Sequence, residues 1–165
     1  MPVRVAVLAA SPSPWQAVIA APGFRIGVRC DDEAVQGIAF LPPGPAQAPV
    51  NALAAEAARQ LAAYLGDPEH SFALPLHPAG TPFQRRVWQR IAAIPVHQTR
   101  SYGDIARDLG SAARAVGQAC GRNPYPVVVP CHRVLAAAGG LGGFARQRDG
   151  HLLDVKRWLL AHEAR

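Results

Sequence analysis

Residues 101–121 read SYGDIARDLGSAARAVGQACG, and this stretch decides the fold of the C-terminal half. Ser101 and Asp104 have the spacing of a reciprocal cap, in which each side chain binds a backbone N–H at the start of a helix. The apolar face of that helix continues to Leu109, and Gly110 ends it. The sequence therefore predicts a short helix that begins directly after Ser101.

A second short helix is predicted immediately after the first. Ser111 can cap it, residues 112–120 form it, and Gly121 ends it. Two short helices joined by a tight turn are typical of a helix-turn-helix, although the same pair also occurs as plain structure inside a domain. Arg114 is the single charged residue of the second helix, so this helix can lie close to a nucleic-acid groove or to the rest of the protein.

The next segment carries a candidate nucleophile. Residues 127–129 are three valines, and they predict a buried strand that leads to the sequence PCHRV at 130–134. A cysteine that attacks carbon must be a thiolate, so it needs a nearby base or positive charge, for which His132 and Arg133 are candidates. Neighbours on an extended chain point to opposite faces, so His132 reaches the sulfur only through a turn or a water. On these residues alone, Cys131 is either a nucleophile or a small core residue.

The N-terminal half begins with an alternating pattern. Between residues 15 and 40 this pattern is clearest at Phe24, Ile26 and Val28, and it predicts two or three antiparallel strands. Apolar residues then recur at helical spacing over residues 53–65, which predicts a helix on the C-terminal side of the strands.

A further helical stripe over residues 83–94 ends at Pro95 and follows a stretch interrupted by prolines. We expect the domain boundary in that stretch, which divides the chain into domains at 1–80 and 81–165.

Composition narrows the class of protein without deciding it. The chain has 165 residues, 50% of them hydrophobic, which is enough to bury a core. Its 17 Lys and Arg outnumber 11 Asp and Glu, for a net charge of +6, and nearly all the cations are arginines. This balance suits phosphate binding, although a basic soluble enzyme without a nucleic-acid partner has the same composition.

The three cysteines, Cys30, Cys120 and Cys131, form no CxxC pair. An odd, unpaired set speaks against a disulfide framework and a zinc knuckle, and it fits a reducing compartment. No apolar run is long enough to span a bilayer. We therefore expect a cytoplasmic protein with no membrane partner and no bound metal.

Ordered blocks in the C-terminal half together resemble the O6-alkylguanine-DNA alkyltransferases, also called methylated-DNA–protein-cysteine methyltransferases. The blocks are VW at 87–88, SYGDIA at 101–106, RAVG at 114–117, NP at 123–124, PCHRV at 130–134 and KRWLLAHE at 156–163. The resemblance implies an α+β fold, with a ribonuclease-H-like N-terminal domain and a winged-helix-like C-terminal domain that contains a helix-turn-helix and the cysteine.

The resemblance also implies an activity. Such a protein repairs double-stranded DNA by direct reversal: it flips out an O6-alkylguanine, or an O4-alkylthymine, and moves the alkyl group irreversibly to Cys131. Each molecule reacts once, as a monomer, with no cofactor, no metal and no obligate protein partner, and it is nucleoid-associated when on DNA. The alternatives are a non-catalytic lesion-binding alkyltransferase-like protein and an unrelated thiol hydrolase that uses Cys131 and His132.

The resemblance assigns four catalytic residues. Cys131 is the nucleophile, His132 the water-linked base, Glu163 the carboxylate that orients the base, and Tyr102 the phenol that helps guanine leave as a neutral molecule. On residue type and position alone, Glu163 is an exposed residue of the C-terminal tail and Tyr102 belongs to the core.

The remaining assignments concern DNA and the base pocket. DNA binding is assigned to Ser101, Arg114, Ala115, Gly117 and Arg133, with Arg114 taking the place of the flipped nucleotide. The substrate pocket is assigned to Asn123, Pro130, Val134, Phe144 and Ala145. The backbone carbonyl of Val134 is expected to read the guanine amine, and Phe144 stands where the family has a tyrosine.

Overall fold

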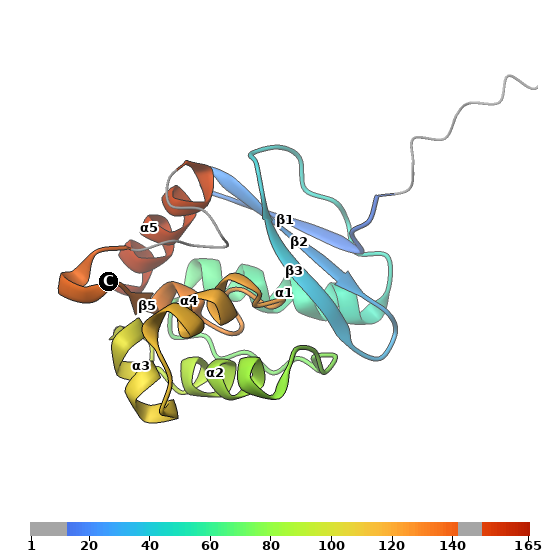
Figure 1. Ribbon diagram of the computed structural model, residues 1–165. Coiled ribbons are helices and arrows are strands. Elements are labelled where there is room, and N and C mark those ends of the chain that lie inside the picture. The colour runs from blue at the N-terminus through green and yellow to red at the C-terminus, as the bar shows by residue number, and fades with distance from the viewer. Residues whose placement is uncertain (1–12, 142–149) are drawn as a thin grey trace, which may run out of the picture.

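The computed structural model describes residues 13–141 and 150–165, and these residues adopt an α+β fold (Figure 1). The first half forms an antiparallel sheet in the order β1-β2-β3, followed by one helix. The strands are β1 (Ala17–Ala21), β2 (Phe24–Cys30) and β3 (Val35–Leu41), and the helix is α1 (Ala52–Gly66). Phe24, Ile26 and Val28 are buried, so the predicted alternation is confirmed.

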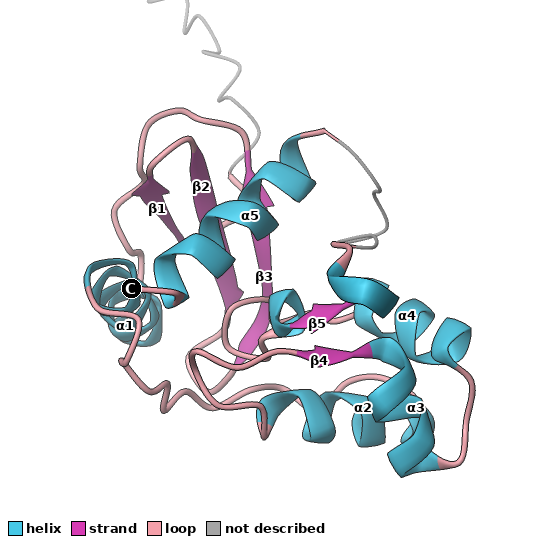
Figure 2. Ribbon diagram, turned by 90° about the vertical axis from the view of Figure 1, so that its left-hand side faces the viewer, coloured by secondary structure: helices cyan, strands magenta, loops and turns pink. Residues whose placement is uncertain are grey.

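The second half is mainly helical, with one short parallel strand pair. Its elements are α2 (Pro82–Ala92), β4 (Arg100–Ser101), α3 (Tyr102–Leu109), α4 (Ala113–Gly121), the 3₁₀ turn η1 (Cys131–Arg133), β5 (Val134–Leu135), the 3₁₀ turn η2 (Ala137–Gly139) and α5 (His151–Glu163). Helices α2, α3 and α4 lie together at one end of the molecule (Figure 2). We refer to residues 13–81 as the N-terminal part and to the described residues from 82 onward as the C-terminal part.

The predicted cap of α3 is confirmed. The Ser101 hydroxyl accepts from the backbone N–H of Asp104 at 3.0 Å, and the Asp104 carboxylate accepts from the N–H of Ser101 at 3.1 Å. Gly110 ends the helix in the left-handed conformation, with φ +62°, which glycine adopts at no steric cost.

The predicted cap of α4 is wrong. Ala112 stands at the N-cap and makes no side-chain hydrogen bond, so the helix starts at Ala113. The backbone N–H of Ser111 instead bonds the carbonyl of Ala106 at 2.9 Å and so closes the preceding helix. Ser111 belongs to the end of α3, and it lies one position before Ala112, the residue at the N-cap of α4.

The predicted strand at 127–129 is also wrong, because these valines form a turn. The N–H of Val129 bonds the carbonyl of Tyr125 at 2.8 Å, and Val127 has φ +74°, a strained value for a β-branched residue. The Asn123 amide binds the carbonyl of Val129 at 2.8 Å and holds this turn in place. Cys131 therefore starts a 3₁₀ turn and does not end a strand.

Helix α5 joins the two parts of the molecule. Its Trp158 packs edge-on against Phe24 of β2, with ring centroids 5.5 Å apart, and it stacks on His162 at 4.8 Å. His162 in turn bonds α1, because its Nε2 is 2.6 Å from the backbone carbonyl oxygen of Tyr64. Buried residues of the sheet and of all five helices consequently form one continuous core. None of the described helices combines the length and apolar character needed to cross a membrane.

Candidate active site

The Cys131 thiol lies inside the protein, where 4% of the residue is exposed. The Asn123 amide nitrogen is 3.2 Å from Sγ and also donates to the carbonyl of Val129, while its oxygen accepts from the N–H of Tyr125 at 2.9 Å. One side chain therefore fixes both the turn and the sulfur that follows it, which places the predicted pocket residue Asn123 against the thiol.

The surroundings of Cys131 favour the protonated thiol. Its contact with the Cys120 thiol and its burial raise the pKa of Cys131 well above the usual value, while Asn123 and Lys156 act in the opposite direction. Thiols attack carbon as thiolates, so this sulfur needs a base that removes its proton.

His132, the residue that follows Cys131, forms a buried pair with Glu163. His132 Nε2 is 2.7 Å from Glu163 Oε2, and both residues are at most 3% exposed. Burial lowers the pKa of His132, so its imidazole is neutral. Burial alone would raise the pKa of Glu163, but hydrogen bonds from His132 and Arg133 outweigh it, lower that pKa and keep the carboxylate ionised.

These charge states assign the proton on His132. An ionised carboxylate only accepts hydrogen bonds, so Nε2 of His132 carries the hydrogen and Nδ1 keeps its lone pair. Nδ1 is buried and has no hydrogen-bond partner among the residues that the structure describes. The imidazole is therefore oriented and neutral, with one basic nitrogen unoccupied by protein groups.

Arg133, which the sequence assigned to DNA binding, bonds the carboxylate of this site. Its side chain is 13% exposed, and it donates from Nε to Glu163 Oε1 at 2.7 Å and from Nη2 to Oε2 at 3.0 Å. The remaining Nη1 donates to the carbonyl of Ile94 at 2.7 Å. The guanidinium points into the protein, where it neutralises the carboxylate of Glu163, and the role of Arg133 in DNA binding stays a prediction.

Tyr102 lies close to the two thiols because β4 pairs with β5. Arg100 is opposite Val134 in this parallel pair, so the start of α3 sits next to the segment that follows Cys131. Burial, and the neighbouring Cys120 and Cys131, raise the pKa of Tyr102, so its phenol keeps its proton at neutral pH. A protonated phenol beside the thiol is able to act as a hydrogen-bond donor or an acid.

Lys156 is a site residue to which the sequence assigned no role. It is fully buried, and its ammonium donates to the carbonyls of Val134 at 2.9 Å and Leu141 at 2.6 Å. Burial lowers the pKa of Lys156 to about 8, and the ammonium lies 5.8 Å from the centroid of the Tyr102 ring. Lys156 lies two helical turns before Glu163, on the same buried face of α5, and this spacing is the signal in the sequence that could have identified it as a site residue.

Helix α4 contains three of the predicted DNA-binding residues, while a fourth, Ser101, caps α3. Arg114 is exposed, Ala115 and Gly117 are half-buried, and a Cβ at Gly117 would meet nothing within 4 Å. Trp88 of α2 holds the far end of this helix by donating to the carbonyl of Ala119 at 2.9 Å. The helix therefore has an anchored buried face and an open outer face of small residues.

The predicted pocket is only partly within the described residues. Pro130 and Val134 are buried, and the Val134 carbonyl that was expected to read the base accepts from Lys156. Phe144 and Ala145 lie outside the described residues. Among the described residues, no group of three or more His, Cys, Asp or Glu side chains is arranged to hold a metal ion.

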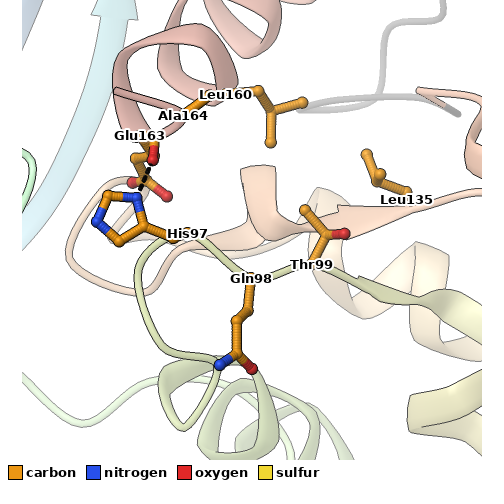
Figure 3. Close-up of a pocket in the computed structure, with 7 residues that line it drawn as sticks. All are labelled: His97, Gln98, Thr99, Leu135, Leu160, Glu163 and Ala164. Carbon is orange, nitrogen blue, oxygen red and sulfur yellow. Dashed lines mark hydrogen bonds between the residues drawn. The ribbon is translucent and has the colours of Figure 1, made fainter.

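A separate hollow lies beside the C-terminal end of α5 (Figure 3). Its volume is about 280 Å³, and it is lined by His97, Gln98, Thr99, Leu135, Leu160, Glu163 and Ala164. His97 hydrogen-bonds the backbone carbonyl of Glu163 through Nδ1 and the carboxylate of Glu69 through Nε2. Of the predicted pocket residues that the structure describes, Asn123, Pro130 and Val134, none lines this hollow, whereas the predicted catalytic residue Glu163 does.

Comparison with known proteins identifies the family. Residues 82–165 match the family model for the DNA-binding domain of 6-O-methylguanine DNA methyltransferase, which is just over half of the chain. The chain belongs to the 6-O-methylguanine DNA methyltransferase family. The sequence resemblance found in the C-terminal half is thereby confirmed.

Members of this methyltransferase family are similar to the chain in sequence. The methylated-DNA–protein-cysteine methyltransferase of Methanosarcina acetivorans is 47% identical over 110 residues, which cover 66% of this chain and 67% of that protein. The constitutive enzyme of Bacillus subtilis is 47% identical over 108 residues, or 64% of this chain and 63% of the relative. The aligned stretches thus span about two thirds of the length of these curated relatives.

The structural match extends further along the chain. The O6-methylguanine methyltransferase of Mycobacterium tuberculosis has a TM-score of 0.74 and 34% identity, with 89% of this chain and 90% of that chain covered. The structure of Mycobacterium tuberculosis OGT in complex with DNA has a TM-score of 0.73 and 35% identity, and it covers 89% of this chain and 91% of its own. The N-terminal part therefore shares the fold of these proteins as well.

Proposed function

We propose that this protein repairs DNA by direct reversal, transferring the alkyl group of O6-alkylguanine, and of O4-alkylthymine, to Cys131 in one irreversible reaction. The observation that carries the proposal is the buried Cys131 thiol, which is held by Asn123 and followed in the chain by His132, a neutral imidazole paired with the ionised Glu163. Membership of the methyltransferase family, and the names of its related proteins, support the same chemistry.

The proposed reaction begins with removal of the thiol proton. His132 Nδ1 accepts the proton through a bridging water, and the ionised Glu163 stabilises the imidazolium that forms. The sulfur then attacks the alkyl carbon, a carbon–sulfur bond forms, and the carbon–oxygen bond to guanine breaks. Tyr102 donates its phenolic proton to a ring nitrogen, so that guanine leaves as a neutral base. The thioether is stable, and the protein is spent.

We further infer how the lesion reaches the sulfur. The alkyl group of a stacked, paired base cannot meet a buried thiol in line, so the base leaves the helix stack. The outer face of α4 lies in the minor groove, where its small residues permit close approach and Arg114 fills the space of the flipped nucleotide. In this proposal residues 1–80 form a ribonuclease-H-like domain and residues 81–165 a winged-helix-like domain.

Mass spectrometry tests the chemistry directly. After mixing with a duplex that contains O6-methylguanine, we expect one methyl group per protein molecule, located on the peptide that contains Cys131. Cys131→Ala should gain none, whereas Cys30→Ala is a matched control, because Cys30 is a buried thiol of the sheet that bonds Asn51. Tight binding of the lesion duplex by the wild type without any adduct would instead indicate a lesion-binding protein.

The role of Arg114 is tested by comparing two substrates. Arg114→Ala should slow repair of the lesion in a duplex by at least about tenfold, while the reaction with free O6-benzylguanine should change little, because the free base needs no flipping. Arg59→Ala, an exposed arginine of α1 that pairs with Glu56, serves as the control for lost charge. Equal losses on both substrates would contradict the role in base flipping.

A further inference from the structure

Tyr64 links the N-terminal part of the chain to the reaction site. It lies on α1, outside the stretch that matches the family model, and 1% of the residue is exposed. Its hydroxyl donates to Glu163 Oε2 at 2.5 Å, across 99 positions of sequence. Its ring packs against Phe72 and His162, with centroids 5.6 and 5.2 Å away, so the phenol has little freedom to turn elsewhere.

The hydroxyl of Tyr64 shares its acceptor with the imidazole. Oε2 of Glu163 accepts from Tyr64, from His132 Nε2 at 2.7 Å and from Arg133 Nη2 at 3.0 Å, while Oε1 accepts from Arg133 Nε. Each donor draws part of the negative charge toward itself. A donor on Oε2 therefore weakens the attraction that the same oxygen exerts on His132.

We propose that Tyr64 is a positioning residue of the His132–Glu163 pair, through which the N-terminal part fixes the carboxylate and limits the charge that it presents to the imidazole. The inference rests on the proposed function, in which His132 accepts the thiol proton. A base must be neutral before it can accept, so the carboxylate must stabilise the imidazolium without forming it prematurely.

The charges around both residues agree with this role. His132 faces the anion Glu163 and the cations Arg133 and Lys156, and Tyr64 faces Glu163, Arg133 and His162. Burial and the adjacent carboxylate raise the pKa of Tyr64 far above the neutral range, so the hydroxyl always donates. Burial lowers the pKa of His132, and losing the Tyr64 donor would oppose this by leaving more charge on Oε2.

Tyr64→Phe is the primary test, because it removes the hydroxyl and keeps the ring. We expect the titration midpoint of His132, followed by ¹⁵N chemical shifts, to rise by about 0.5 to 1 pH unit. The acidic limb of the single-turnover rate of methyl transfer should move upward by the same amount. Tyr125→Phe is the matched control: Tyr125 is also buried and also bridges the two parts, but its hydroxyl donates to His77, so His132 should titrate as in the wild type.

A second variant covers the case in which Tyr64→Phe fails to fold. A fluorinated tyrosine placed at position 64 is a stronger donor of the same shape, so it should lower the His132 midpoint. Unchanged midpoints in the folded variants, with rates reduced evenly at every pH, would overturn the inference. The titration requires no DNA, so a wild-type protein that gains no methyl group refutes the proposed function separately and leaves this result readable.

Discussion

The N-terminal and C-terminal parts of the molecule contribute to the site in different ways. The C-terminal part contains every motif, the proposed nucleophile Cys131 and its proposed base His132, and it alone matches the family model. The N-terminal part has no motif of its own, yet its Tyr64 hydroxyl binds the Glu163 carboxylate that also bonds His132. The sequence motifs identify the residues with a proposed chemical role. A side chain that positions those residues, such as Tyr64, can lie in a segment that has no recognisable motif.

The N-terminal part is hydrogen-bonded to the site at two places. At Glu163, the Tyr64 hydroxyl bonds the carboxylate. Glu69 bonds His97, and His97 in turn bonds the backbone carbonyl of Glu163. At the turn before Cys131, the N–H of Ile38 bonds the carbonyl of Pro124 at 2.8 Å, and the hydroxyl of Tyr125 bonds the carbonyl of His77. The turn before Cys131 and the carboxylate of Glu163 are therefore both bonded to the N-terminal part.

Replacing the carboxylate itself should have the largest effect, because both parts of the molecule meet there. Glu163→Gln leaves the buried Arg133 guanidinium without its counter-ion, and its amide offers one acceptor oxygen where the carboxylate offered two, with an NH2 group facing donors at the other position. We expect the free energy of unfolding to fall by about 3–5 kcal/mol and methyl transfer to be lost. Urea unfolding and the single-turnover assay measure these two changes.

The matched control for that variant is Glu56→Gln, which changes a half-buried glutamate of α1 that bonds Arg59 and Gln60 on the same helix. It should unfold at the wild-type urea concentration and keep full activity. Wild-type stability of Glu163→Gln would show that the network around the carboxylate does not join the two parts.

Lys156→Met is a change confined to the C-terminal part, and its effect should be the next largest. Lys156 holds down the pKa of Cys131, so without the ammonium that pKa should rise further. Each unit of rise reduces the thiolate about tenfold at neutral pH, and the loss should recover as the pH increases. The rate of reaction with free O6-benzylguanine across pH measures this.

The comparison with Tyr64→Phe makes the Lys156 result specific. Lys156→Met should move the basic limb of the profile, which reports the thiol, whereas Tyr64→Phe should move the acidic limb, which reports His132. A uniform loss of rate in Lys156→Met, with no recovery at high pH, would assign Lys156 to holding the carbonyls of Val134 and Leu141 alone.

The elements that the sequence predicted well are those with local causes. The Ser101–Asp104 cap and Gly110 fix the two ends of α3 within ten residues of chain. Alternation at Phe24, Ile26 and Val28 likewise follows from burial of one face of a strand. These features depend on neighbours in sequence, so a pattern is sufficient to find them.

The valines at 127–129 show where local reasoning fails. Three β-branched residues favour a strand, but the Asn123 amide and the Tyr125 carbonyl capture the backbone of Val129 and produce a turn. The hydrogen bonds that decide between the two conformations come from the fold around the thiol. Strand propensity carries no information about them.

The site was predictable only through the order of its motifs. Spacing alone placed Glu163 at an exposed tail, whereas it is 3% exposed and bound by four groups, including Tyr64 and His97. The resemblance named Cys131, His132 and Glu163 but gave no sign of Tyr64, because their contact joins residues far apart in the chain. Such a contact becomes visible only when the chain is folded.

Tyr125→Phe should have a smaller effect on stability. It tests by itself the hydrogen bond between the N-terminal part and the turn before Cys131. The hydroxyl donates to the carbonyl of His77, so its removal leaves one buried hydrogen bond unmade. We expect the free energy of unfolding to fall by about 1 kcal/mol, with the His132 titration unchanged. Loss of methyl transfer without a loss of stability would show that this contact controls the geometry of Cys131 instead.

The smallest expected effect concerns His97, whose two hydrogen bonds require both ring nitrogens to carry protons. Glu69, and then the carbonyl of Glu163, raise the pKa of His97, so the folded protein binds this proton more tightly than the unfolded chain. Its contribution to stability is complete below the unfolded pKa of about 6.5, and it is lost as the pH rises through the folded value. His97→Asn should therefore lower Tm at about pH 5.5 and have little effect near about pH 9.

Asparagine suits the left-handed backbone at this position, where φ is +71°. Because the side chain is 39% exposed, the difference should be small, and Glu69→Gln should reduce its pH dependence by removing the larger of the two causes. A Tm difference that is constant from acid to alkaline pH would mean that His97 acts by packing, and that Tyr64 alone connects the N-terminal part to Glu163.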